Sequence, residues 1–160
     1  MIALSSCYDD GDGVEKDERK AAEWLRKAAD TGDTTAMICI GLRCRSKDNS
    51  IEAVKWFRKA ADAGDSMAMF KLGICYREGD GVEKDKAECA KWWLKASRAG
   101  NVIAKFNLGI CYETGYGVEK DRDEAERLIR EAAEAGYRPA EDYLLYDLCV
   151  PENTLPSHVN

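Results

Sequence analysis

The sequence has only one histidine and three prolines among its 160 residues, and it has no long hydrophobic run. Its longest apolar stretch, residues 36–42, is far shorter than the roughly 18 residues that indicate a membrane span. The first ten residues lack the basic region and apolar run of a secretory signal. We therefore expect a cytoplasmic protein, or a secreted one if the chain is a fragment that has lost its signal.

Histidine is scarce enough to restrict the chemistry. The one histidine, His158, lies in a tail with two prolines. Catalysis by a buried Ser/His or Cys/His pair is therefore not expected. The formal net charge of −6 opposes nucleic-acid binding. The charge is uneven, because the chain from Glu113 onward holds 12 acidic against 5 basic residues. We expect no nucleic-acid partner, no metal and no cofactor.

An internal repeat organises what is present. The sequence LGICY occurs at 72–76 and 108–112, and the loop GDGVEKD occurs at 11–17 and 79–85 and, with one change, at 115–121. The second repeat is four residues shorter, because residues 45–49 replace the glycine loop. We predict one domain over residues 1–149 and a disordered tail over 150–160. Its units are repeats at about 1–33, 34–65, 66–101 and 102–137, and a terminal capping helix at 138–149.

Each repeat is predicted to form two helices. Ala68, Leu72 and Tyr76 are spaced four residues apart, which is helical periodicity. N-caps of the helices are predicted at Asp33, Asp65, Asn101, Asn49, Asp85 and Asp121. Capping-box partners of the second helices are predicted at Glu52, Glu88 and Glu124. Gly73 and Gly109 lie within helices, and we expect small alanine faces to approach them.

This pattern resembles the Sel-one-like repeat (SLR), a relative of the tetratricopeptide repeat. The residues that match it in one unit are Ala68, Leu72, Gly73, Tyr76, Gly79, Gly81, Val82, Asp85, Trp92, Ala96 and Gly100. The resemblance covers about residues 1–149. It implies an all-α fold, a right-handed α/α superhelical solenoid of helix-turn-helix repeats that holds protein partners on its concave face.

Other features have structural explanations. The seven cysteines are expected to be reduced and buried, because equivalent positions in stacked repeats lie too far apart for disulfides and no CxxC zinc motif occurs. The tryptophans recur at second-helix spacing and are expected in the core. The glycine loops lack the ligand pattern of a calcium or phosphate site.

The predicted binding surface is a groove lined by the first helices, if these face inward as in tetratricopeptide relatives. Its apolar floor suits a peptide or an amphipathic helix, and its arginines could clamp a carboxylate. An alternative is that curvature packs these side chains on one another. The groove residues are Ile38, Leu42, Arg45, Phe70, Ile74, Arg77, Phe106, Ile110 and Glu113.

The preferred function is a non-catalytic protein-interaction module, an adaptor, scaffold or regulator. One alternative is a secreted SLR-type hydrolase or binder of β-lactam or cell-wall compounds, which is disfavoured by the absence of a nucleophile motif. Another is a structural subunit that self-associates through an uncapped N-terminal face. In the second repeat, Arg43, Arg45 and Lys47 form a basic patch beside the lost loop, which is either a specificity feature or repeat decay.

Overall fold

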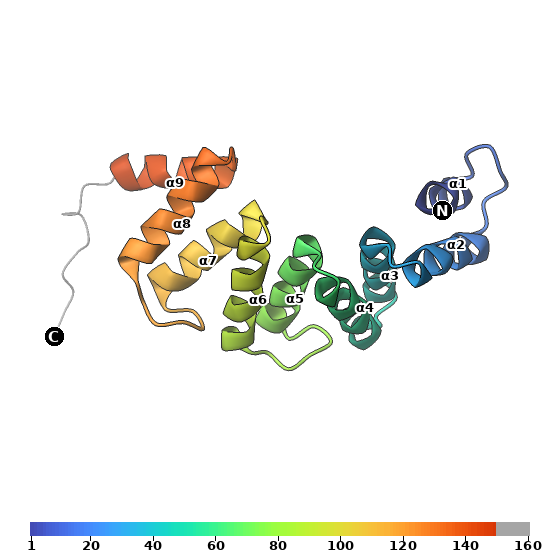
Figure 1. Ribbon diagram of the computed structural model, residues 1–160, viewed down its shortest axis with the longest axis horizontal. Helices are drawn as coiled ribbons and strands as arrows, with labels where there is room; N and C mark the ends of the chain where they lie inside the picture. Colours follow the sequence, from blue (N-terminus) through green and yellow to red (C-terminus); the bar gives the residue numbers. More distant parts are fainter. Residues whose placement is uncertain (150–160) are drawn as a thin grey trace.

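The computed structural model describes the backbone of residues 1–149 and the side chains of residues 1–146. The predicted tail and His158 therefore lie outside the described residues, as does the side chain of Cys149. Helices form throughout the described part, without strands, and follow one another as an open arc with α1 and α9 at its ends (Figure 1). The helices are α1 Ile2–Asp10, α2 Glu18–Asp30, α3 Thr34–Ser46, α4 Ser50–Asp62, α5 Ser66–Glu78, α6 Lys86–Arg98, α7 Val102–Thr114, α8 Arg122–Glu134 and α9 Arg138–Cys149.

The predicted N-caps are confirmed. The side chains of Asp33, Asp65 and Asn101 each accept a hydrogen bond from the backbone amide of the residue three positions later. The carboxylate of Asp85 accepts from the amides of Ala87 and Glu88 at 2.8 and 3.0 Å. Because these bonds satisfy amides that a helix start leaves unpaired, they fix where each helix begins.

The predicted capping boxes are wrong. The amides of Asp85 and Asp121 donate to the carbonyls of Tyr76 and Tyr112, each at 3.0 Å, across the loop from the preceding helix. That bond occupies the donor that a capping-box glutamate would accept from. The three glutamates instead pair with a cation three residues later: Glu52 with Lys55, Glu88 with Lys91 and Glu124 with Arg127.

The glycines within the first helices allow close packing of each helix pair, but large side chains approach them rather than alanines. A Cβ atom at Gly73 would lie 2.3 Å from the Trp93 ring, and one at Gly41 would lie 2.5 Å from Phe57. Both rings are buried. The expectation that alanine faces approach these glycines is therefore wrong. Because glycine has no side chain, a ring of the second helix can rest directly on the backbone of the first helix.

The tryptophans are only partly in the core. Trp92 and Trp93 are buried, whereas Trp24 and Trp56 are half-buried. The Lys27 ammonium lies 4.5 Å from the centre of the Trp24 ring. Because the long side chains of the outer helices can cover an aromatic face while keeping their charge in water, these two rings serve as cation-covered surface as well as core.

The glycine loops close the junctions between repeats. Gly81 has φ +74°, and a Cβ atom there would lie 2.2 Å from the carbonyl oxygen of Ser50, at the start of α4. A Cβ atom at Gly117 would likewise lie 2.0 Å from the carbonyl oxygen of Lys86, at the start of α6. Each loop thus packs its backbone on the preceding repeat. The α3–α4 connection is a tight turn without such a loop (Figure 1).

Candidate functional site

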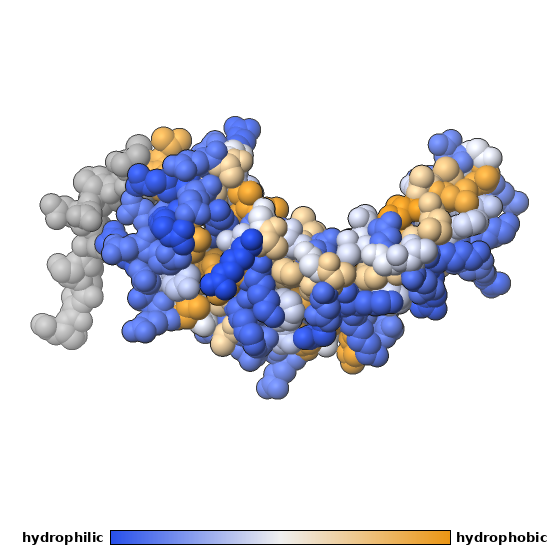
Figure 2. Space-filling view, in the orientation of Figure 1, coloured by the Kyte–Doolittle hydropathy of each residue, from blue (hydrophilic) through white to orange (hydrophobic). Residues whose placement is uncertain are grey.

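The inner side of the arc carries the predicted groove residues. The first helices α1, α3, α5 and α7 line this side (Figure 1). Figure 2 shows hydrophobic side chains gathered along the inner edge, whereas the outer edge is mostly hydrophilic. Leu42 is 39% exposed. Ile38 is buried, Glu113 is exposed, and the other predicted residues are half-buried: Arg45, Phe70, Ile74, Arg77, Phe106 and Ile110.

Two hollows interrupt this inner surface. The first, of about 310 Å³, lies between α1 and α3 and is lined by Ile2, Ser6, Cys39 and Leu42 among others. The second, of about 200 Å³, lies between α5 and α7, with Ile110 in its lining. Each has a cation in its lining, Arg43 in the first and Arg77 in the second. The inner surface therefore has separate places for at least two apolar side chains of a ligand.

The two groove arginines already have partners. The Arg45 Nε atom lies 2.7 Å from Asp80 Oδ2, and its Nη2 atom lies 3.6 Å from Glu78 Oε2. Arg77 pairs with the same Glu78 at 3.1 Å and lies over the Trp93 ring. These pairs are partly exposed, and such pairs contribute roughly 0–1 kcal/mol. A carboxylate from a partner can therefore compete for either guanidinium.

The groove residues of α7, Phe106, Ile110 and Glu113, are partly covered by α9. The Phe106 ring packs on Tyr137 and Tyr143, with centroid distances of 5.5 and 5.9 Å. The Tyr143 hydroxyl donates a hydrogen bond to Glu113. The exposed face of α9 mixes Glu141 and Asp142 with Leu145 and Tyr146, so its role as a polar cap stays a prediction. The open part of the groove is centred on α3 and α5.

The cysteines whose side chains are described are free thiols. Cys75, Cys89 and Cys111 are buried, and Cys7, Cys39 and Cys44 are half-buried. Burial raises the pKa of Cys75 to about 11 and that of Cys89 to about 12. Buried neutral thiols of this kind are poor nucleophiles and poor metal ligands, and the described residues include no cluster that could hold a metal ion.

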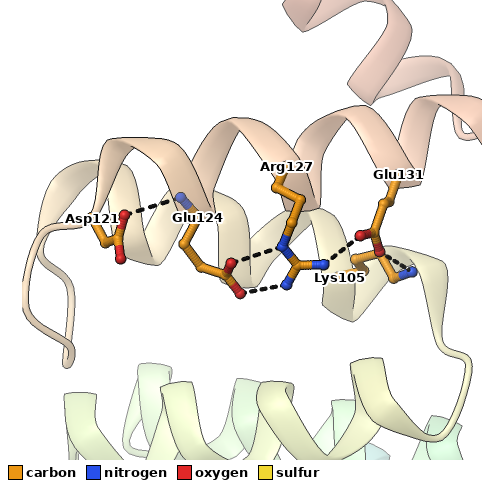
Figure 3. A network of polar contacts seen from close by, with 5 residues as sticks. All are labelled: Lys105, Asp121, Glu124, Arg127 and Glu131. Atoms are coloured by element: carbon orange, nitrogen blue, oxygen red, sulfur yellow. Dashed lines mark hydrogen bonds and ion pairs between the residues drawn. The ribbon is translucent and has the colours of Figure 1, made fainter.

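Glu124, Glu126 and Glu131 of α8 are ion-paired, an arrangement that does not prepare them for proton transfer. Arg127 bridges Glu124 and Glu131, and Lys105 of α7 reaches Glu131 at 2.8 Å (Figure 3). The hydrogen bond from Lys105 is the main cause of a lowered pKa at Glu131. A carboxyl group with a lowered pKa stays ionised near neutral pH, which does not suit a general acid.

One feature that sequence reasoning missed is a pocket of about 340 Å³ between α2 and α3. It lies at the junction between the first and second repeats, beside the α3–α4 connection that lost its loop, and Lys47 and Asn49 of that connection line it. The four residues missing from the second repeat were the signal for it. Its floor is apolar, with Ala22, Leu25, Ile40 and Cys44. The charged residues of its lining are Arg19, Glu23, Arg26, Arg43 and Lys47.

Comparison with known proteins assigns this architecture to a family. Residues 1–33, 37–65, 66–101 and 102–137 match the Sel1 repeat, so the chain belongs to the Sel1 repeat family. The predicted resemblance and the predicted all-α solenoid are confirmed. A search of curated proteins found no match.

Several solved structures share the fold. A protective antigen of uropathogenic Escherichia coli with an SLR fold, c5321, is 35% identical over 91% of this chain, with a TM-score of 0.83. A Sel1 repeat protein from Oxalobacter formigenes is 35% identical over 89% of the chain, with a TM-score of 0.81. The chain spans 32% and 60% of the lengths of these two proteins. Cysteine rich protein B of Helicobacter pylori is 25% identical over 80% of this chain and 95% of its own, with a TM-score of 0.66.

The family establishes a general role. Sel1 repeat proteins generally mediate protein–protein interactions, and the fold is typically non-catalytic. No helix in the described part of the chain is long and apolar enough to cross a membrane. The inner surface of the arc is the part of this chain whose shape and apolar content fit such an interaction.

Proposed function

We propose that this Sel1-repeat arc is a non-catalytic adaptor, scaffold or regulator that holds a segment of a partner protein in its inner groove. The observation that carries the proposal is the row of accessible apolar side chains on α3 and α5, Leu42, Phe70 and Ile74, flanked by the two hollows. Exposed apolar surface of this kind, edged by polar groups, is typical of protein-binding sites. The bound segment is a short peptide or amphipathic helix whose apolar side chains enter the hollows.

The proposed segment also carries acidic residues. Arg45 and Arg77 lie at one edge of the groove, and their present partners are partly exposed carboxylates of the same protein. A carboxylate of the ligand replaces such a partner at little cost, because partly exposed ion pairs are weak. Charge at the edge of an interface acts mainly on specificity and association rate.

The direct test is to compare two charge-introducing substitutions at exposed apolar positions. Leu42→Glu changes the inner face, whereas the control Ile51→Glu changes a residue that is 66% exposed at the start of α4. Affinity purification with quantitative mass spectrometry should recover the same partners with the wild-type protein and Ile51→Glu, and fewer with Leu42→Glu. Equal recovery with both variants would contradict the groove as the binding surface.

The acidic character of the ligand has a separate test. The double variant Arg45→Glu/Arg77→Glu should lower the affinity for a purified partner, with circular dichroism confirming that the helices persist. Unchanged affinity would refute the carboxylate clamp but leave the apolar groove standing.

Two further measurements separate the alternative roles. Light scattering should show a monomer that grows only when a partner is added, whereas a self-associating subunit would be larger alone. A chromogenic cephalosporin should not be hydrolysed, whereas a β-lactam hydrolase of the SLR type would turn it over.

A further inference from the structure

The pocket between α2 and α3 is the place that a glycine loop fills in the neighbouring junction. In the third repeat, Tyr76 and Val82 pack on the core beside Val54, Phe57 and Leu72. The positions 32 residues earlier are Cys44 for the tyrosine and Ala22, Leu25 and Ile40 for the three core residues. All four of these residues line the pocket. The valine has no counterpart, because the shortened α3–α4 connection omits it.

The loop also supplies backbone to the junction that the second repeat lacks. Gly81 packs so closely against the start of α4 that a Cβ atom at this position would lie 2.2 Å from the carbonyl oxygen of Ser50. The equivalent helix start in the first repeat is that of α2, where Arg19 lines the pocket. The second repeat thus leaves open a volume. At the next junction, the loop of the third repeat fills the equivalent volume with an extended backbone and one apolar side chain.

The charges around the pocket select the kind of segment that would fill it. The lining has four cations against one acid, Glu23. Arg43 pairs with Asp9, whereas Arg19, Arg26 and Lys47 have no ion-pair partner among the described residues.

Arg26 shows where a carboxylate fits. Its counterpart in the second repeat, Arg58, lies over the Trp92 ring and donates a hydrogen bond to the Tyr76 hydroxyl at 2.7 Å, both in the third repeat. Arg26 lies in the same way over the Trp56 ring, but Cys44 stands where the tyrosine would be. An oxygen acceptor supplied from outside would complete this arrangement, and a carboxylate would do so with a charge-assisted hydrogen bond.

We infer that the pocket is a second docking site, separate from the inner groove, for an extended acidic segment of a partner protein. The segment places an apolar side chain of valine size over Leu25 and Ile40 and a carboxylate beside Arg26. It acts as an external substitute for the missing loop, whose own sequence in the other repeats is rich in acidic residues around a valine. This site goes beyond the proposed groove, because its lining shares only Leu25 and Arg43 with the nearer hollow of the groove and because it takes its own ligand.

The test uses the protein's own loop as the probe. An acetylated peptide EGDGVEKD, the sequence of residues 78–85, is titrated into ¹⁵N-labelled protein and followed by chemical-shift changes. The expected changes centre on Ala22, Arg26 and Cys44, which line the pocket but not the groove hollows, and they weaken as the salt concentration rises. A peptide with serine in place of valine should bind about tenfold more weakly, because it loses the buried apolar side chain.

Two protein variants close the pocket by different means. Cys44→Tyr restores the ring found in the third repeat, and replacement of residues 45–49 by residues 77–85 restores the loop. Each should weaken peptide binding at least about tenfold. Cys44→Ser, which adds no bulk, and Leu42→Glu, which changes only the inner groove, should both leave it unchanged.

The inference is overturned if millimolar peptide produces no shifts, if the shifts lie on the inner face, or if both pocket-filling variants bind the peptide like the wild type. Loss of binding in Leu42→Glu would assign the peptide to the groove and likewise overturn it. Because the groove has its own partner assay, failure here leaves the proposed function unaffected.

Discussion

The second and third repeats have helices of the same length but different connections. Each of their four helices, α3, α4, α5 and α6, has 13 residues. In both repeats the amide before the second helix donates to a carbonyl of the first helix at 3.0 Å, from Asn49 to Cys44 and from Asp85 to Tyr76. The pairing of helices is therefore independent of the loop, and the loop decides whether the junction with the preceding repeat is filled.

The short connection uses a different backbone device. Asp48 adopts φ +56°, and it is the one non-glycine residue with positive φ in the described part of the chain. Asp is among the few residues that tolerate this conformation. The third repeat turns through Gly79 and Gly81 instead. A tight turn with Asp48 thus replaces a longer glycine loop without disturbing the helices on either side.

The largest expected effect comes from breaking the contact between the glycine loop of the third repeat and the start of α4, a contact that has no equivalent in the second repeat. Gly81→Ala should lower the free energy of unfolding by about 3 kcal/mol, because it adds backbone strain at positive φ and an overlap with the Ser50 carbonyl. Gly13→Ala is the matched control. It has a similar φ of +71° but nothing within 4 Å of its built Cβ, and should cost about 1 kcal/mol. Urea denaturation measures both, and equal losses would show that the loop does not support the junction.

A second comparison concerns the packing that the two repeats share. Gly41→Ala and Gly73→Ala should each destabilise the protein by about 1–2 kcal/mol, because overlap with a buried ring outweighs the gain in helix propensity. In the double variant Gly41→Ala/Phe57→Leu, removal of the ring should make the total loss smaller than the sum of the single losses. Tolerance of Gly41→Ala alone would mean that the second repeat is packed more loosely than the third.

The helices and their caps could be predicted from the sequence because both depend on local signals. An Asp or Asn before a stretch of helical periodicity determines its own hydrogen bonds, as at Asp65 and Asp85. The capping boxes were wrong because their outcome depends on a longer-range contact, the amide of Asp85 meeting the carbonyl of Tyr76. The repeat alignment matches Trp92 with Trp24 and Trp56, but the ring that rests on Gly73 belongs to its neighbour Trp93.

The candidate site was predictable to a lesser degree. Helical spacing placed Phe70 and Ile74 on one face of their helix, since that relation is local. The repeat alignment added Leu42, at the position equivalent to Ile74. Side chains from other helices decide what remains accessible, as where Tyr143 of α9 contacts Phe106. The pocket beside Cys44 was missed, because it results from a tyrosine and a loop that are absent from a junction between two repeats. The four missing residues indicate the lost loop, but not the space that its loss leaves between the helices.

Thiol reactivity distinguishes the two repeats at neighbouring positions. Cys75 is buried, and its burial raises the pKa to about 11, so at pH 8 roughly one thiol in a thousand is ionised. Cys44 is half-buried and lines the pocket. Iodoacetamide labelling with peptide mapping at pH 8 should modify Cys44 more than about tenfold faster than Cys75. The Cys75 rate should keep rising between pH 8 and 10, because its thiol titrates only above that range; a plateau near pH 9 would contradict the burial.

The smallest expected effect tests whether the two repeats are joined by charge as well as by packing. Arg45, at the end of α3, reaches Asp80 in the loop of the next repeat at 2.7 Å and Glu78 at 3.6 Å. Arg45→Ala should cost less than about 1 kcal/mol, because the groups are partly exposed and side-chain entropy offsets the attraction. The loss should shrink further at high salt. Lys55→Ala, which removes an exposed pair within α4, is the control for a purely local contact. A loss at Arg45 well above 1 kcal/mol that persists in salt would mean that this arginine helps to hold the loop of the third repeat against the second repeat. Arg45 would then be less available to a partner's carboxylate.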